Sequence, residues 1–136
     1  MRVHERDVEI GVAGRLLAGR LAVPERASGL VVLAVDDASP DGRRIQHVSR
    51  VLHDAGLGTL LLAVRTAEEE LAQDWALKDS SNVELVAHRL EVARDWLQRD
   101  DNLSLLPVGY LGSGLGAGAA RAPVVDGAGD QLLARP

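Results

Sequence analysis

The 136-residue sequence contains no cysteine and no phenylalanine, and its aromatic side chains are limited to two tryptophans and one tyrosine. Without cysteine, the chain has no disulfide, no thiolate nucleophile and no cysteine-ligated zinc. With so few aromatics, leucine, valine and alanine must fill the core. Hydrophobic residues make up 46% of the sequence, which is enough for one domain with a real core.

Long apolar runs and clusters of positive charge are also absent. No apolar run approaches the roughly 18 residues that span a bilayer, and the start, MRVHERDVEI, lacks the apolar core of a secretory signal. The chain carries 15 basic and 20 acidic side chains, a net charge of −5. Phosphate contacts need clustered positive charge, which argues against a nucleic-acid partner. We expect a cytoplasmic protein with no membrane partner.

Alternating and continuous apolar runs predict strands. Val8 and Ile10 alternate with polar residues, and Ala13 and Gly14 break the run, so residues 7–23 predict a β-hairpin. Continuous apolar segments are typical of strands that are buried on both faces of a sheet. Such segments occur at 30–35, 59–64 and 105–111.

Helical periodicity fills the segments between these strands. Apolar residues recur at helical spacing from Pro40 up to Gly56, which stands where the glycine after a helix belongs. A second stripe of apolar residues at helical spacing predicts another helix, which ends near Arg99. Between the two, Thr66 and Glu69 have the spacing of a capping box, which predicts a short helix.

Strands that alternate with helices are typical of parallel pairing through right-handed crossovers. We therefore predict an α/β fold, a three-layer sandwich whose mostly parallel sheet is led by an antiparallel N-terminal hairpin. We expect residues 1–136 to form a single domain, in which 121–136 is a short tail or an edge strand.

A glycine-rich stretch, GYLGSGLGAGAA at 109–120, follows the last predicted strand. Such turns bind phosphates or dinucleotides, or present a nucleophile. Gly112, Gly114 and Ala117 fit the dinucleotide pattern, but that pattern normally follows the first strand of a β-α-β unit rather than the last. No Gly-Lys-Ser/Thr follows, which excludes a P-loop.

Acidic residues after the first buried strand offer a second alternative. Asp36, Asp37 and Asp41 resemble the paired acids that bind magnesium in phosphorelay receiver domains. Receivers also need an aspartate after the next buried strand, where this chain has Val64 and Arg65. A solvated loop whose acids favour a helix N-terminus accounts for the same residues.

The third alternative is a nucleophile elbow, a strained strand-to-helix turn that presents a serine. Four segments, taken in their order and spacing, resemble the dienelactone-hydrolase branch of the α/β-hydrolase family over about residues 8–120. They are AGRLAVPERASGLVVLA, VSRVLHDAGLGTLLLAVRTAEEE, VELVAHRLEVARDWLQRD and LPVGYLGSGLGAGAA. The resemblance implies the fold of the N-terminal half of an α/β-hydrolase.

Carried over residue by residue, the resemblance implies an altered elbow. The two flanking glycines of the elbow match at Gly112 and Gly116. The nucleophile position falls on Gly114, and Ser113 stands one residue early. On a sharp turn, a shift of one residue points the side chain away from the substrate pocket.

The other catalytic positions of the family also differ. Relatives carry His-Gly in the loop that helps form the oxyanion hole, where this chain has Val35 and Asp36. An acid beside a developing oxyanion raises the barrier, because the two negative charges repel. The family's acid and histidine lie beyond the nucleophile. Here Asp130 is the candidate acid, and no histidine follows Gly114.

All four histidines precede the elbow. His47 and His53 fall on different faces of the first predicted helix, and His88 lies beside the apolar stripe of the later helix. We expect these side chains at the surface or at its boundary, and we expect no metal and no cofactor. The acidic run at 68–70 is expected to be a solvated helix start.

We therefore expect a degenerate α/β-hydrolase-like protein that has lost serine-hydrolase activity. A half-sheet leaves the strand at 105–111 near an edge, and exposed apolar edges pair with other chains. A homodimer or another protein partner would cover that edge. Two alternatives stay open. One is a minimal esterase or lactonase that uses Ser113, with His47, His53 or a histidine of a partner chain as its base. The other is a module that binds small anions or nucleotide phosphates at the backbone of 112–116.

Overall fold

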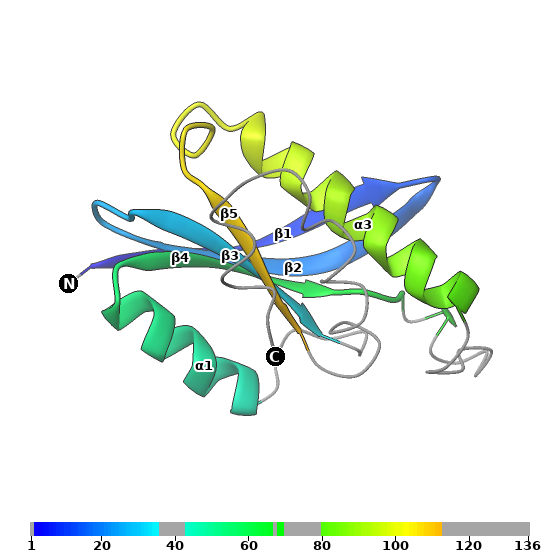
Figure 1. The fold of residues 1–136 in the computed structure, drawn as a ribbon, viewed down its shortest axis with the longest axis horizontal. Coiled ribbons are helices and arrows are strands. Elements are labelled where there is room, and N and C mark those ends of the chain that lie inside the picture. Colours follow the sequence, from blue (N-terminus) through cyan, green and yellow to red (C-terminus); the bar gives the residue numbers. More distant parts are fainter. Residues whose placement is uncertain (1, 36–42, 67, 70–79, 113–136) are drawn as a thin grey trace.

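A mixed β-sheet organises the chain in a computed structural model that describes residues 2–35, 43–66, 68–69 and 80–112 (Figure 1). The described strands form one five-stranded sheet with the spatial order β1-β2-β4-β3-β5. The strands are β1 (Val3–Val12), β2 (Arg15–Pro24), β3 (Gly29–Val35), β4 (Leu57–Ala63) and β5 (Val108–Gly112).

The N-terminal hairpin is longer than its apolar pattern predicts. β1 and β2 are antiparallel from the pair Val3 and Pro24 to the pair Val12 and Arg15, so the hairpin extends beyond the predicted residues 7–23. The first half of β1 has no apolar alternation because most of its side chains are exposed. β2 then pairs antiparallel with β4 and joins the hairpin to the rest of the sheet.

The other pairings are parallel. β3 pairs with β4 on one side and with β5 on the other, as the alternation of strands and helices predicts. The crossovers contain α1 (Arg43–Asp54) and α3 (Ser80–Gln98). Among the described helices, none combines the length and the apolar character that crossing a membrane requires.

The two helices cover opposite faces of the sheet, so the predicted three-layer α/β fold is confirmed (Figure 1). On the α3 side, alternate residues of all five strands pack with α3 in one large core. On the α1 side, three buried residues form a much smaller core, surrounded by hydrophobic residues that are only partly buried. The three residues are Val31, Leu33 and Leu61.

The last strand is shorter than predicted. β5 begins at Val108, and Leu105 lies in the preceding turn with 94% of its surface exposed. The carbonyl of Pro107 accepts a 2.8 Å hydrogen bond from the amide of Leu30, so pairing with β3 starts only there. The apolar run thus continues outside the strand. Residues 121–136 lie outside the described residues.

Turn glycines occupy the positions that the sequence predicts. Gly56 follows α1 with a φ of 83°, as expected for a glycine that ends a helix. The hairpin turn consists of Ala13 and Gly14, which have φ values of 50° and 79°. Two consecutive positive φ values are typical of a type I′ hairpin turn. Ala13 therefore adopts a conformation that alanine disfavours by roughly 1–2 kcal/mol.

Replacing Ala13 by asparagine is expected to stabilise the protein by about 0.5–1 kcal/mol, because Asn-Gly is the preferred pair for this turn. Urea unfolding measures the change. Ala55→Asn is the matched control, because Ala55 is also exposed but is not among the residues with positive φ. A lower free energy of unfolding for Ala13→Asn than for the unchanged protein would contradict the turn assignment.

Candidate functional site

The positions that correspond to the oxyanion loop and the elbow meet at one edge of the sheet. β3 and β5 run side by side, with Ala34 paired to Gly112, and β3 ends at the next residue, Val35. The amide of Val64 donates a 3.0 Å hydrogen bond to the carbonyl of Val35, which holds the ends of β3 and β4 together. This arrangement places Val35 and Gly112 on neighbouring strands, as the resemblance implies.

Five further predicted site residues cannot be placed in this geometry. They lie outside the residues that the structure describes, and they are Asp36, Ser113, Gly114, Gly116 and Asp130. The conformation of the elbow beyond Gly112 and the role of Asp130 therefore stay predictions.

A buried arginine supports this edge of the sheet. The Nη1 atom of Arg89 on α3 donates a 2.9 Å hydrogen bond to the carbonyl of Val64, directly after β4. The guanidinium also forms two hydrogen bonds with the carboxylate of Glu69, at 2.7 and 2.9 Å. Only 3% of the Arg89 side chain and 12% of the Glu69 side chain are exposed. The arginine thereby ties α3 to the segment that leaves β4.

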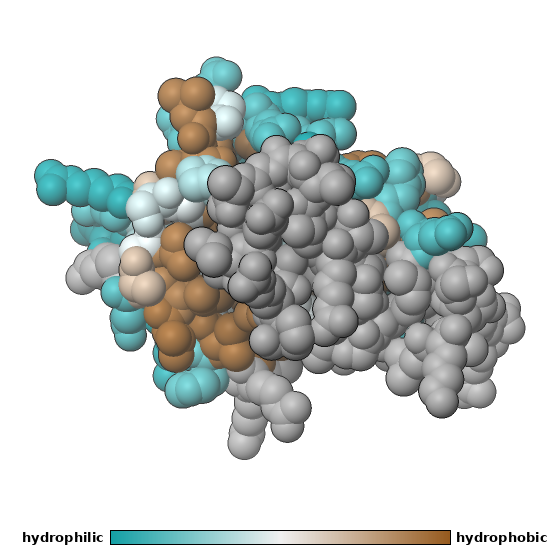
Figure 2. Space-filling model, viewed as in Figure 1, coloured by the Kyte–Doolittle hydropathy of each residue, from teal (hydrophilic) through white to brown (hydrophobic). Residues whose placement is uncertain are grey.

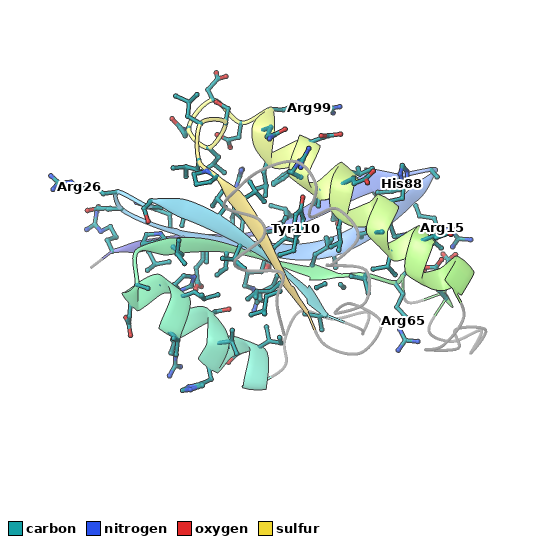
Figure 3. All side chains as sticks on the ribbon, in the orientation of Figure 1. Arg15, Arg26, Arg65, His88, Arg99 and Tyr110 are labelled. Carbon is teal, nitrogen blue, oxygen red and sulfur yellow. The ribbon has the colours of Figure 1, made fainter. Side chains whose placement is uncertain are left out.

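The predicted capping box is confirmed next to this ion pair. The amide of Thr66 donates to Glu69 Oε1 at 2.9 Å, and the amide of Glu69 donates to the Thr66 hydroxyl at 3.2 Å. Arg15 from the hairpin lies 3.7 Å from Glu68 and 4.0 Å from Glu69, and Figure 3 shows its side chain at this end of the molecule. The Glu69 carboxylate thus joins three separate segments of the chain.

The charge state of Glu69 follows from these contacts. Burial by itself raises the pKa of Glu69. Hydrogen bonds from Arg89 and from the Thr66 amide, together with the positive charges of Arg89 and Arg15, outweigh burial and lower the pKa below 4.5. The carboxylate is therefore ionised at neutral pH and acts as a structural anchor.

Arg89 is not among the predicted site residues, although the sequence carries a signal for it. Arg89 stands three residues after Val86 and next to Leu90, within the apolar stripe of α3. A charged residue on such a stripe needs a buried partner. The prediction that the acidic run at 68–70 is solvated holds for Glu68, which is 89% exposed. It is wrong for Glu69, because a buried arginine neutralises that carboxylate.

Three of the histidines are exposed, as expected, and one is not. His4, His47 and His88 lie at the surface, and Figure 3 shows His88 on the outer side of α3. His53 is 8% exposed, and its Nε2 lies 2.9 Å from the Thr59 hydroxyl. The expectation of a surface or boundary position is wrong for His53, because the last turn of α1 directs this residue toward β4. Desolvation lowers its pKa below 6.5, although Glu5 and Asp54 oppose the shift.

His53 lies far from the elbow. Its partner Thr59 is level with Val31 on β3, which is level with Gly109 on β5. Gly112 is three residues further along β5, roughly 10 Å along the sheet and about 10 Å across two strand spacings. This separation disfavours His53 as the base of a minimal esterase. Among the described residues, no three histidine, aspartate or glutamate side chains gather in a way that could hold a metal ion.

Glu69→Gln is expected to lower the free energy of unfolding at pH 7 by about 2–4 kcal/mol, because it leaves the buried Arg89 without a charged partner. A carboxylate whose pKa is lowered by folding stabilises the protein above its unfolded pKa, and this contribution disappears as the pH falls through the folded pKa. The difference between Glu69→Gln and the unchanged protein should therefore shrink on acidification below about pH 4.

Chemical denaturation at pH 7 and at acidic pH measures this difference. Glu68→Gln is the matched control, since its side chain is 89% exposed. Equal stability of the two variants at pH 7 would show that the Arg89–Glu69 pair does not anchor the edge.

Comparison with known proteins supports the fold that the sequence predicts. The chain is 33% identical to a dienelactone hydrolase from Anabaena variabilis, with a TM-score of 0.79 over 91% of this chain and 58% of that one. An esterase from Pyrococcus furiosus superposes with a TM-score of 0.68 at 17% identity, over 90% of this chain and 47% of that one. No protein-family model matches the sequence.

A curated relative is known from Mycobacterium tuberculosis. The chain is 40% identical over 124 residues to a protein provisionally named a phosphoribosyl transferase. The match covers 89% of this chain but 27% of the relative, so the chain spans about a quarter of the length of that protein. Together with the strand order, the parallel strands and the antiparallel hairpin, the structural matches show that the chain has the dienelactone-hydrolase-like fold of the α/β-hydrolases.

Proposed function

We propose that this chain is a self-associating α/β-hydrolase-like module without serine-hydrolase activity, and that two copies pair through the β5 edge of the sheet. The observation that carries the proposal is the difference between the two edges of the described sheet. β1 contains four charged residues and one histidine, whereas β5 contains no charged residue and no histidine. Charged edges resist pairing with other chains, and uncharged edges favour it.

The β5 edge has the composition of a pairing surface. Its sequence, VGYLG, is paired with β3 on one side only among the described strands. Tyr110 points into the core on the α3 side, and Leu111 packs partly buried on the α1 side. Among the described residues, no strand pairs with the outer side of β5, and we propose that β5 of a second copy does so.

The α1-side apolar surface adjoins this edge. We define it as the partly buried residues around the smaller core, which are Ile45, Val48, Leu52, Leu57 and Leu111. Figure 2 shows apolar atoms exposed over α1 and the adjacent part of the sheet. A second copy seated against β5 would cover this surface, and burial of apolar area stabilises such an association by about 25 cal/mol per Å².

The loss of hydrolase activity is supported by the residues at the catalytic positions. The nucleophile position falls on Gly114, and Val35 and Asp36 stand where relatives supply part of the oxyanion hole. The one buried histidine of the described residues is bonded to Thr59, well away from Gly112. A serine hydrolase needs a base within hydrogen-bond reach of its nucleophile.

Phosphoribosyl transfer is suggested by the name of the mycobacterial relative. The chain covers 27% of that protein. No contact among the described residues favours this activity over the fold-based proposal. We therefore propose the interaction module as the function.

Leu105→Lys together with Leu111→Lys is expected to convert the self-associated protein into a monomer, because both changes put charge beside the β5 edge. Sedimentation velocity at micromolar concentration measures the oligomeric state. Leu16→Lys is the matched control, since this leucine is 61% exposed in the hairpin at the opposite side of the sheet. A strictly monomeric unchanged protein, or dissociation by Leu16→Lys alone, would contradict the proposal.

A fluorophosphonate probe is expected not to label the protein, because the nucleophile position is a glycine. Intact-mass spectrometry detects the adduct, and an active serine hydrolase serves as the positive control. Labelling of the unchanged protein that disappears in the Ser113→Ala variant would contradict the proposed loss of serine-hydrolase activity. It would support the minimal esterase instead.

A further inference from the structure

A polar pocket lies on the α1 face of the sheet, beside β1, β2 and β4 and away from the β5 edge. It has a volume of about 250 Å³ and opens between α1 and the sheet, next to the hairpin. α1 contributes Gln46, Ser49, Arg50 and His53, and β1 and β2 contribute Glu5 and Arg20. In Figure 1 the end of α1 and the start of β4 lie at the left, whereas β3, β4 and β5 end toward the right.

Ser49 is the unusual residue of this pocket. It is 7% exposed, its Oγ is fully buried, and this atom has no hydrogen-bond partner among the described residues. A buried hydroxyl without a partner costs free energy, so such groups are rare unless they serve a ligand. Ser49 also lines the pocket, so a molecule held there could give its hydroxyl a hydrogen-bond partner.

The neighbouring charges indicate which chemistry the pocket favours. Arg50 follows Ser49 on the α1 wall, and Arg20 lies on the facing strand β2, where its Nε also bonds Asp7 at 3.1 Å. Glu5 is exposed on β1 and is the one carboxylate among the lining residues. Guanidinium and hydroxyl groups donate hydrogen bonds, and they match the acceptor oxygens of an anion.

A hydrolytic role for Ser49 does not fit the contacts. His53 lies one turn further along α1, but Ser49 Oγ makes no hydrogen bond to it. The Nε2 atom of His53 is taken by Thr59 at 2.9 Å. Because the serine lacks a base within bonding distance, the pocket has the features of a binding site rather than of a catalytic one.

We propose that this pocket binds the oxyanion of a small carboxylate or phosphate ester, held between the Arg50 guanidinium and the Ser49 hydroxyl, with the positive charge of Arg20 opposite. Such a site is independent of the elbow and of the β5 edge. It also gives a partner to the buried Ser49 hydroxyl, which has none among the described residues.

NMR titration with inorganic phosphate and, separately, with acetate tests the proposal at constant ionic strength. We expect saturable shifts of the Ser49 and Arg50 amides with one or both anions. Saturation by phosphate alone identifies a phosphate ester as the ligand class, and saturation by acetate alone identifies a carboxylate. Shifts no larger than those with chloride would overturn the proposal.

Two variants and a matched control locate the site. Arg50→Gln and Ser49→Ala are each expected to weaken anion binding about tenfold, because each removes a hydrogen bond to a charged group. Arg99→Gln removes the same charge from an exposed position at the end of α3, visible in Figure 3, and should leave binding unchanged. Unchanged binding in both pocket variants would overturn the assignment.

Stability of the Ser49→Ala variant gives a second readout. Its melting temperature should not fall and should rise by about 1–4 °C, because the change removes an unpaired buried hydroxyl and favours the helix. Weaker binding together with unchanged or higher stability is the signature of a ligand-binding hydroxyl. A clear fall in melting temperature would show instead that Ser49 has a structural partner, and would overturn its role in binding.

Discussion

The parallel pairing of β3 with β4 is the constraint on which the rest of the structure depends. These two strands occupy the middle of the sheet, and both of their faces are buried. β2 attaches to β4 and β5 attaches to β3, so the hairpin and the last strand reach the sheet only through this pair. Because parallel strands cannot be joined by a tight turn, the chain must also supply the helix that crosses between them. α1 makes this crossing, and α3 makes the crossing from β4 to β5, which pairs parallel with β3; the two helices thus cover the two faces.

The two faces and the two edges of the sheet differ in ways that bear on function. The α3 side carries a large core to which all five described strands contribute, whereas three residues make the core on the α1 side. Charged side chains line β1, and β5 has none. The chain spans 58% of the length of the dienelactone hydrolase that it resembles. The proposed association through β5 rests on these differences between the faces and edges.

Polar groups are buried at two separate places beside the sheet, with different consequences. At the C-terminal end of β4, Arg89 is satisfied by Glu69 and by a backbone carbonyl, and the result is a rigid anchor for the segment after β4. On the α1 face, Ser49 is buried beside an open pocket, and its hydroxyl has no hydrogen-bond partner among the described residues. Buried polar networks in which every group has a hydrogen-bond partner help to specify a fold. A buried polar group without a partner can gain one from a bound molecule. The same scaffold therefore separates a structural polar cluster from a candidate binding pocket.

The sequence by itself determined the α/β class, the hairpin, the two crossover helices, the capping box at Thr66 and Glu69, and the glycine after α1, because these depend on local periodicity and turn chemistry. It did not determine the start of β5, the burial of His53, the Arg89–Glu69 pair or the pocket beside Ser49. Each of these depends on contacts between residues that are distant along the chain. Leu105 belongs to the same apolar run as β5, yet only pairing with β3 decides where the strand begins. In the same way, only the packing of α1 and α3 against the sheet decides which of their polar residues lose contact with water.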